Sequence, residues 1–415
     1  MTMTVFTFKS LMIALLLVIS LLPQNTVNAD TLRFDVEIKW SVRSFPAMSI
    51  CSAEDYIYVV GSPDGHGAKV EMRYWDDGSL IKTWSSIKFE DLADCVIIDK
   101  RLYAVGLGWN ILVFDLKLNL LDYVYRDLTD WAYSVVSYGD YLYIAGSGDT
   151  FKKWRVEMWR IKDLTLVKEY SSDPTEYNEY AASINVNPVT KQLWVVGMQG
   201  GRTSSFRVEI LDLYLNPLRI IERPDRSEAL TITFDNDGYA YIGGEGFIAK
   251  YDKYGNEITM VEIPSSSVDI LLYDIVPPGI YDFLFAFVTD KTGVFSKQVL
   301  YIFDKNLNQV YSLQLGGDIR TDAFFRPGKA DYYGYLYVAG GERKEPGQIT
   351  SWTIYAIHVW CEEMPSFTTP VPPTPPVLPT PNYQPIVLLG LIVFVITIGL
   401  LVVGIIIIIK LIRKG

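Results

Sequence analysis

A short strand-like segment that ends in glycine recurs along this chain and restricts its choice of fold more than any other feature of the sequence. In each copy an aromatic residue stands three positions before the closing glycine, as Tyr58 does before Gly61. Seven copies recur at a spacing of about 46 residues, and the divergent sixth keeps its aromatic residue but not its glycine. The copies are residues 56–61, 102–106, 141–146, 193–197, 240–244, 284–288 and 336–340.

Each copy is flanked by further strand-like segments. The preceding segment has small residues at matched positions, which suits strands that crowd together around an axis. These small residues are Ala47, Ala93, Ala132, Ala181 and Ala229, followed two positions later by Ser49, Cys95, Ser134, Ser183 and Thr231. The following segment commonly ends in a turn with Asp and Asn, and an outer segment comes next. Four strands per repeat are typical of a propeller blade, so residues 30–363 are predicted to form an all-β, seven-bladed β-propeller.

The last repeat lacks an outer strand of its own. Its third strand, Trp352 to Trp360, runs directly into Cys361 and a proline-rich segment. The unused segment from Leu32 to Trp40 alternates between apolar and polar residues and precedes the first repeat. We expect this N-terminal strand to complete the seventh blade, because closure of the ring protects strand edges that would otherwise pair with other molecules.

A double glycine and an aromatic-aspartate turn give the repeat a resemblance to the kelch and NHL families of β-propellers. The residues concerned are Gly243-Gly244, Gly340-Gly341, Tyr251-Asp252 and Phe303-Asp304. The double glycine is similar to that of kelch repeats, and the turns are similar to those of both families. The resemblance covers residues 31–360 and implies a propeller that acts chiefly as an interaction module.

Residues 1–29 have the pattern of a secretory signal peptide. Lys9 supplies a positive charge, an apolar run extends from Leu11 to Leu22, and a small-residue triplet that ends at Ala29 suits cleavage after that residue. A run of about twelve residues is too short to span about 30 Å of hydrocarbon. We therefore expect removal of this segment, rather than an N-terminal membrane anchor.

The other end of the chain carries a longer apolar stretch. Residues 386–409 are almost entirely apolar or glycine and would extend about 36 Å as a helix, enough to cross a bilayer with some tilt. The basic tail at 410–415 is expected on the cytoplasmic side. Residues 364–385 are rich in proline and threonine and are expected to form an extended stalk. The prediction is a single-pass protein of the cell membrane with an extracellular propeller.

Acidic residues are concentrated in the predicted propeller. All 48 Asp and Glu, but only 33 of the 37 Lys and Arg, lie within residues 30–363, which gives this region a net charge of −15. Such a surface repels nucleic acid and favours cations or basic partners. Only two histidines occur, so a His-based zinc site or a His-dependent triad is not expected. No cofactor is predicted, although bound calcium would suit this charge.

Three cysteines, Cys51, Cys95 and Cys361, allow one disulfide bond at most and leave one thiol over. Cys51 and Cys95 fall on neighbouring inner strands with their side chains on the same side. Counted from Ala47 and Ala93, their positions differ by two residues. This offset favours free buried thiols over a bridge.

Loops that lead into the inner strands should meet at one mouth of the central channel, and rigid scaffolds commonly carry their binding residues on such loops. The candidate binding residues are Asp127, Asp130, Trp131, Glu176, Tyr180, Asp225 and Glu228. Aromatic rings beside carboxylates suit a sugar or a basic peptide segment, and neighbouring carboxylates would attract a cation such as calcium. Binding or scaffolding for a protein, a glycan or a solute is the favoured function.

An enzymatic alternative stays open at this point. A carboxylate pair facing across the channel, such as two of Asp94, Asp130 and Glu228, would suit an enzyme that cleaves extracellular polysaccharide or another polymer. The motifs of zincins and of nucleophile-elbow hydrolases are absent from the sequence. No individual residue is predicted to be catalytic, and the ligands of any metal stay undetermined.

Overall fold

The computed structural model describes residues 32–44, 47–62, 67–126, 129–200, 205–275, 281–290, 297–314, 326–327, 335–345 and 348–363. These residues form strands and turns, and no helix among them has the length and apolar character needed to cross a membrane. All of the strands belong to one unit, Met1–Met364, and the chain continues in a second unit, Pro365–Gly415. The predicted signal peptide, stalk, transmembrane helix and basic tail lie outside the described residues.

Four separate four-stranded antiparallel sheets follow one another along the chain, and each is one blade. The first contains β2 (Ala47–Ala53), β3 (Tyr56–Gly61), β4 (Ala68–Tyr74) and β5 (Leu80–Ser86). The second contains β6 (Leu92–Ile98), β7 (Arg101–Gly106), β8 (Asn110–Asp115) and β9 (Leu120–Val124). The third contains β10 (Ala132–Tyr138), β11 (Tyr141–Gly148), β12 (Lys153–Arg160) and β13 (Thr165–Ser171). The fourth contains β14 (Tyr180–Val186), β15 (Leu193–Gln199), β16 (Ser205–Leu211) and β17 (Pro217–Arg223).

The fifth and sixth blades share one continuous sheet of six strands. The first part of β20 pairs with β19 as the outer strand of the fifth blade, and its later part pairs with β21 as the inner strand of the sixth. β19 covers both the second and the third strand of the fifth repeat, with Gly246 between them at a φ of 83°. The strands are β18 (Ala229–Phe234), β19 (Ala240–Tyr251), β20 (Glu257–Ile275), β21 (Tyr281–Asp290), β22 (Lys297–Phe303) and β23 (Gln309–Gln314).

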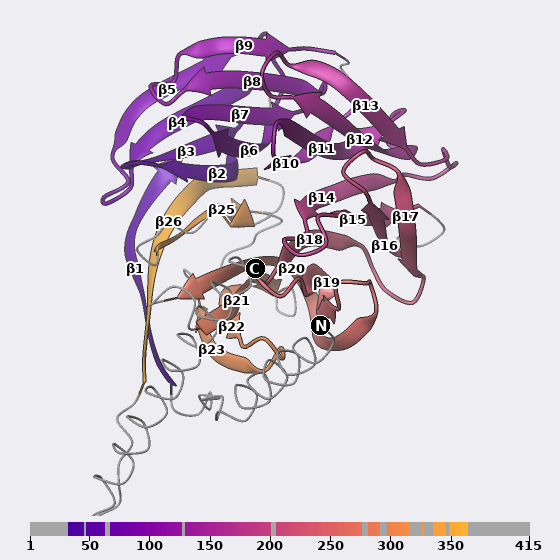
Figure 1. Ribbon diagram of the computed structural model, residues 1–415. Helices are drawn as coiled ribbons and strands as arrows, with labels where there is room; N and C mark the ends of the chain where they lie inside the picture. The colour runs from indigo at the N-terminus through magenta and orange to yellow at the C-terminus, as the bar shows by residue number, and fades with distance from the viewer. Residues whose placement is uncertain are drawn as a thin grey trace, which may run out of the picture. The chain divides into compact units, whose positions relative to one another are not determined.

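The seventh blade joins both ends of the propeller. Its strands are β1 (Leu32–Ser44), β26 (Gln348–Glu363), β25 (Tyr335–Glu345) and β24 (Arg326–Pro327), in that order across the sheet. β1 pairs with β26 from Leu32 opposite Glu363 to Ser44 opposite Trp352, and the two strands run side by side in Figure 1. The predicted closure by the N-terminal strand is confirmed, and the strand continues beyond the predicted segment to Ser44.

The inner strands form a ring. Contacts link β2 to β6, β6 to β10, β10 to β14, β14 to β18 and β18 to β20, and β24 contacts both β20 and β2. In Figure 1 the late strands β25 and β26 accordingly lie beside the early strands β1 and β2. The described residues therefore form an all-β, seven-bladed propeller, as predicted from the spacing of the repeat.

The aromatic residue of the repeat is buried between blades. Tyr58, Tyr103, Tyr143, Trp194, Tyr241 and Phe285 are each at most 1% exposed. Several of the tyrosines also bond to the next blade, because the hydroxyl of Tyr58 donates to the carbonyl of Leu116 at 2.7 Å and that of Tyr143 to Leu213 at 3.0 Å. The predicted packing role of these aromatic residues is confirmed.

The carbonyls that these tyrosines reach belong to the Asp-Asn turns. In the second blade, Oδ1 of Asp115 accepts the amides of Lys117 at 2.9 Å and Asn119 at 2.8 Å, and Oδ2 accepts the Asn119 side chain at 2.8 Å. The turns that start at Asp212, Asp252 and Asp304 have the same bonds. Burial alone would raise the pKa of Asp115, but these bonds lower it below its ordinary value. The predicted structural role of these carboxylates is confirmed.

The second blade corrects the predicted alignment by one residue. Leu92 pairs with the closing glycine of its blade and so holds the position predicted for Ala93. Asp94 consequently holds the position equivalent to Ser49, whereas the sequence predicted that Cys95 would hold it. The prediction was wrong because Ala93 is an extra residue in a β-bulge, and its alanine side chain resembles those at the true matched positions.

Cys51 and Cys95 form a disulfide bond between β2 and β6, with their Cα atoms 6.2 Å apart. The expectation of free thiols is therefore wrong. Once Leu92 is taken as the reference, the two positions differ by one residue rather than two, which brings the side chains within bonding reach. The bond ties the first two blades together at the wall of the channel.

Candidate functional site

In each blade from the second to the fifth, one residue lies directly before the inner-strand residue that pairs with the closing glycine, at one mouth of the channel. In the second to fifth blades these residues are Asp91, Trp131, Tyr180 and Glu228. The closing glycines lie against their backbones, because a Cβ on Gly146 would stand 1.8 Å from the carbonyl oxygen of Trp131 and one on Gly197 2.1 Å from that of Tyr180. The glycine that defines the repeat is thus required for this close approach, and it fixes the place of three predicted site residues.

A one-residue bulge follows in each of the strands β2, β6, β10, β14 and β18. Bulges at the rim of a sheet redirect side chains. The extra residues are Met48, Ala93, Tyr133, Ala182 and Leu230. Tyr133 alone among these five is aromatic, and the adjacent blades have alanines at this position. Sequence reasoning missed Tyr133, although its place directly after Ala132 in the repeat would have signalled it.

Four of these side chains form a continuous row, here called the mouth row: Trp131, Tyr133, Tyr180 and Glu228. The rings of Trp131 and Tyr133 are stacked, 5.5 Å apart at 9°, and those of Tyr133 and Tyr180 are 5.3 Å apart at 46°. The hydroxyl of Tyr180 donates to Oε2 of Glu228. All four residues are partly exposed. Three consecutive blades thus present one surface of rings that ends in a carboxylate.

Two carboxylates act on the phenol of Tyr180. Burial, together with the negative charges of Glu228 and Glu245, raises the pKa of Tyr180 above its ordinary value. The phenol therefore keeps its proton and serves as the donor in its bond to Glu228. Glu245 is exposed, and its amide donates to the carbonyl of Glu228 at 3.1 Å, so both carboxylates belong to the same edge of the fifth blade.

The predicted site residue Asp130 supports the fold beside the mouth row. It is 5% exposed, and its carboxylate accepts Nη1 of Arg155 at 2.9 Å and the amide of Thr150 at 3.2 Å. Thr150 lies in a turn in which Asp149, Thr150 and Phe151 all have φ between 57° and 66°. Non-glycine residues rarely adopt this conformation, and such strain concentrates near functional sites. Asp130 therefore holds a strained turn in place rather than facing a ligand.

The remaining predicted site residues are separate from the mouth row. Glu176 is exposed on the loop before β14. Asp225 is exposed and pairs with Arg223, whose guanidinium lies 3.1 Å from it and lowers the pKa of the carboxyl. Asp127 lies outside the described residues. Trp131, Tyr180 and Glu228 are thus the predicted residues that the structure brings together.

The channel itself contains a polar hollow of about 250 Å³. Its polar lining comes from four blades, namely Ser49, Asp94, Ser134, Ser137, Ser183 and Asn185, and the fifth blade adds the apolar Ile232. Oδ1 of Asp94 accepts the hydroxyl of Ser49 at 2.8 Å, and Oδ2 accepts the amide of Val135 at 2.9 Å. The carboxylate of Asp94 therefore joins the inner strands of three blades.

The three carboxylates of the enzymatic alternative have different partners. Asp94 bonds to Ser49, Asp130 bonds to Arg155, and Glu228 accepts from Tyr180. These contacts do not form a facing pair of carboxylates. Within the described ranges, no three side chains of His, Cys, Asp or Glu gather where they could hold a metal ion.

Buried arginine-glutamate pairs, which sequence reasoning missed, support this side of the ring. Nη2 of Arg155 lies 2.7 Å from Oε1 of Glu157, and the guanidinium lies 4.7 Å from the ring centre of Trp109 in the preceding blade. The next blade repeats the arrangement at 2.5 Å and 5.2 Å with Arg207, Glu209 and Trp154. The signal was present in the sequence, because both third strands contain Arg-Val-Glu.

No protein-family model and no curated protein sequence matches this chain. Among solved structures, the WD40 domain of Neurospora crassa Pan2 is similar, with a TM-score of 0.54 and 11% identity over 78% of this chain and 95% of that domain. The fold is a seven-bladed β-propeller. At this level of identity the likeness bears on the fold alone, so function is argued from the mouth row.

Proposed function

We propose that this chain is a binding module of the cell surface that engages a protein, a glycan or a cationic partner at the mouth row. The observation that carries the proposal is the partly exposed row of Trp131, Tyr133 and Tyr180, which ends at Glu228. Rigid aromatic side chains beside a polar group are typical of binding surfaces. Propellers generally mediate interactions, and the likeness of the repeat to kelch and NHL repeats agrees with such a role.

The cell-surface location rests on the two ends of the chain. Residues 1–29 have the pattern of a signal peptide, and residues 386–409 have that of a transmembrane helix followed by a basic tail. The disulfide between Cys51 and Cys95 supports this location, because disulfides persist mainly in oxidising compartments. The stalk at 364–385 would separate the propeller from the membrane.

One experiment tests both location and binding. Intact cells that express the full chain are stained with an antibody against the propeller and with arrays of fluorescent glycans and peptides. We expect surface staining, and we expect binding of at least one probe to be lost in the double variant Trp131→Ala/Tyr133→Ala. Tyr214→Ala is the matched control, because Tyr214 is 68% exposed on a turn at the opposite end of its blade.

The two parts of the proposal fail separately. Staining that appears only after the cells are permeabilised would rule out the surface location. Probe binding that Tyr214→Ala weakens as much as the double variant would remove the mouth row as the binding site.

A further inference from the structure

The mouth row combines two features that attract cations. The faces of aromatic rings are electron-rich, so a cation placed over the face of Trp or Tyr is stabilised. Tyr133 lies between the other two rings, stacked on Trp131 and tilted against Tyr180, so Trp131 and Tyr180 form the two ends of the aromatic part of the row. Glu228 and Glu245 lie at the Tyr180 end of the row. Rings and negative charge therefore border the same part of the surface.

Two buried sites in this chain show that an aromatic ring beside carboxylates accommodates a guanidinium. Arg155 lies over Trp109 and pairs with Glu157 and Asp130, and Arg207 is placed in the same way one blade later. In both cases a guanidinium fills the space between an indole ring and carboxylates. The mouth row repeats these ingredients at the surface. A guanidinium suits them better than an ammonium group, because it can stack on a ring and bond to a carboxylate at once.

The net charge of the propeller also favours a cationic ligand. Residues 30–363 carry a net charge of −15, which steers basic partners toward the propeller and repels acidic ones. A neutral glycan gains nothing from this field. The field and the local chemistry of the row therefore select the same class of ligand.

We propose that the mouth row binds an arginine-containing basic peptide segment, with one guanidinium stacked on Tyr180 and paired with the carboxylates of Glu228 and Glu245, and a second guanidinium stacked on Trp131 at the other end of the row. This inference rests on the proposed function, because it assigns a ligand class to the same site. The partner is accordingly a protein with an exposed basic segment, and binding weakens as salt screens the charges.

The test uses the full chain in detergent micelles and fluorescence anisotropy of a labelled peptide, (Gly-Ser-Arg)5. The matched probe replaces each arginine by citrulline, which has the same shape without the charge, and a labelled chitohexaose represents neutral glycans. We expect the arginine peptide to bind at least about tenfold more tightly than the citrulline peptide. Trp131→Ala and Glu228→Gln should each weaken its binding about three- to tenfold, as expected for loss of one cation–π contact or one charge pair.

Control variants separate this contact from general charge and from misfolding. Glu54→Gln removes an equal charge on the turn between β2 and β3, at the opposite end of its blade, and should leave binding nearly unchanged. Trp131→Phe keeps an aromatic face and should retain much of the binding. Melting temperatures of all variants should match that of the wild type.

Three outcomes would overturn the inference, and they differ in whether they also reject the proposed function. Equal binding of the arginine and citrulline peptides, or equal losses with Glu228→Gln and Glu54→Gln, would show that no guanidinium site exists. Binding of chitohexaose that depends on Trp131, without binding of the arginine peptide, would keep the proposed function and reject the cationic ligand. Absence of any binding that depends on Trp131 would reject both.

Discussion

The interface between the first and second blades has the same buried contacts as the interface between the fifth and sixth blades. The two interfaces differ in the side chains that pack around those contacts. In both, a buried tyrosine donates to the Asp-Asn turn of the next blade, Tyr58 to Leu116 at 2.7 Å and Tyr241 to Lys305 at 3.1 Å. In both, a phenylalanine precedes the aspartate of that turn. The differences arise from the outer strands, which the repeat does not specify as closely.

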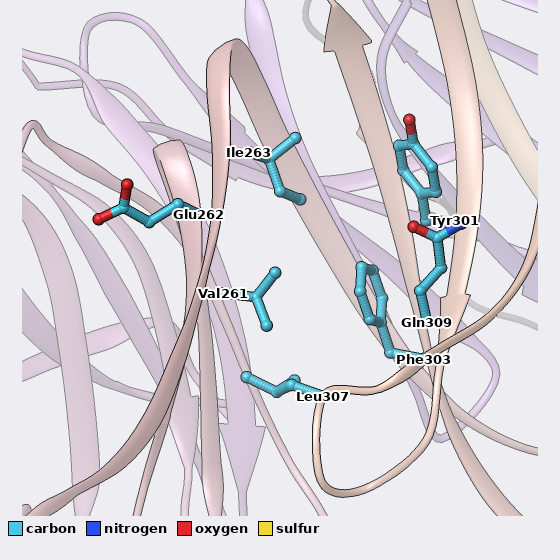
Figure 2. Close-up of a pocket in the computed structure, with 7 residues that line it drawn as sticks. All are labelled: Val261, Glu262, Ile263, Tyr301, Phe303, Leu307 and Gln309. Carbon is cyan, nitrogen blue, oxygen red and sulfur yellow. The ribbon is translucent and has the colours of Figure 1, made fainter.

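The first difference is the residue that closes the interface from outside. Trp84 on β5 packs edge-on against Phe114 of the next blade, with ring centres 4.8 Å apart. Val261 holds the equivalent position on β20. Trp84 and Val261 each pair with the third strand of their own blade, at the residue two positions before the bulge in that strand. The smaller side chain leaves a hollow of about 290 Å³, in which Val261 and Ile263 face Phe303 while Glu262 points away (Figure 2).

The second difference is the basic residue that bonds to the turn. At the first interface the exposed Lys82 on the outer strand donates to the carbonyl of Lys117 at 2.7 Å. The equivalent position at the fifth interface is Thr259, and Lys250 on the third strand donates to the carbonyl of Lys305 at 2.6 Å instead. Lys250 is buried between blades. The comparison shows that residues of the inner positions determine the shared contacts of an interface. Residues of the outer strands determine how completely side chains fill the remaining space.

The largest effect should come from making the first interface resemble the fifth. Trp84→Val removes a half-buried indole from between two blades, and we expect it to lower the free energy of unfolding by about 2 to 4 kcal/mol, as truncated core aromatics do. The measurement is urea unfolding of the full chain in detergent. Ile81→Val on the same strand is the control, because Ile81 is 53% exposed and the change should stay within about 0.5 kcal/mol. Equal effects of the two substitutions would show that Trp84 does not close the interface.

The reverse change should have a smaller effect of opposite sign. Val261→Phe places an aromatic side chain in the hollow at Phe303, and we expect it to raise the free energy of unfolding by about 1 kcal/mol, as cavity-filling substitutions commonly do. Val261→Ala should lower it. A loss of stability with Val261→Phe would mean that β20 lies too close to β22 for a larger side chain and that the hollow is not usable space.

The smallest effect concerns pH and the buried lysine of the fifth interface. Burial lowers the pKa of Lys250 below its ordinary 10.5. The unfolded chain therefore binds more protons between the two pKa values, so the cost of burying the charge is present in full below the folded pKa and disappears as pH rises toward 10.5. Wild type should gain stability relative to Lys250→Met over this range, measured by unfolding at constant ionic strength.

The matched control at the first interface is Lys82→Met, where the ammonium group is exposed. A difference between wild type and Lys250→Met that stays constant with pH would show that the lysine is solvated rather than buried. A difference that falls with rising pH would contradict the sign of the shift.

Much of the fold could be predicted because the repeat is a local pattern. The aromatic residue and the glycine three positions later fix the second strand of each blade, and a Cβ at Gly146 or Gly197 would collide with the backbone of the adjacent inner strand. The missing outer strand of the last repeat could be predicted by counting strands, and β1 supplies it. The ends of the chain, with their predicted membrane anchor, lie outside the described residues and stay predictions.

The site depended on contacts that a local pattern does not contain. The sequence predicts Trp131, Tyr180 and Glu228 as loop residues of the site. They form one row because Tyr133, which the bulge redirects, contacts both Trp131 and Tyr180. Asp130 looked equivalent to them, yet Arg155, which lies 25 residues away in the chain, binds its carboxylate.

By itself, the sequence determined the number of blades, the buried aromatic positions and the ring closure, because these follow from residues spaced regularly along one chain. Only the tertiary structure decided which cysteines pair, which carboxylates are neutralised by arginine and which aromatic side chains meet at the mouth. The physical reason is register: one extra residue in the inner strand of each of the first five blades shifts every later side chain relative to the neighbouring blade. Contacts between blades depend on that shift, and the repeat does not reveal it.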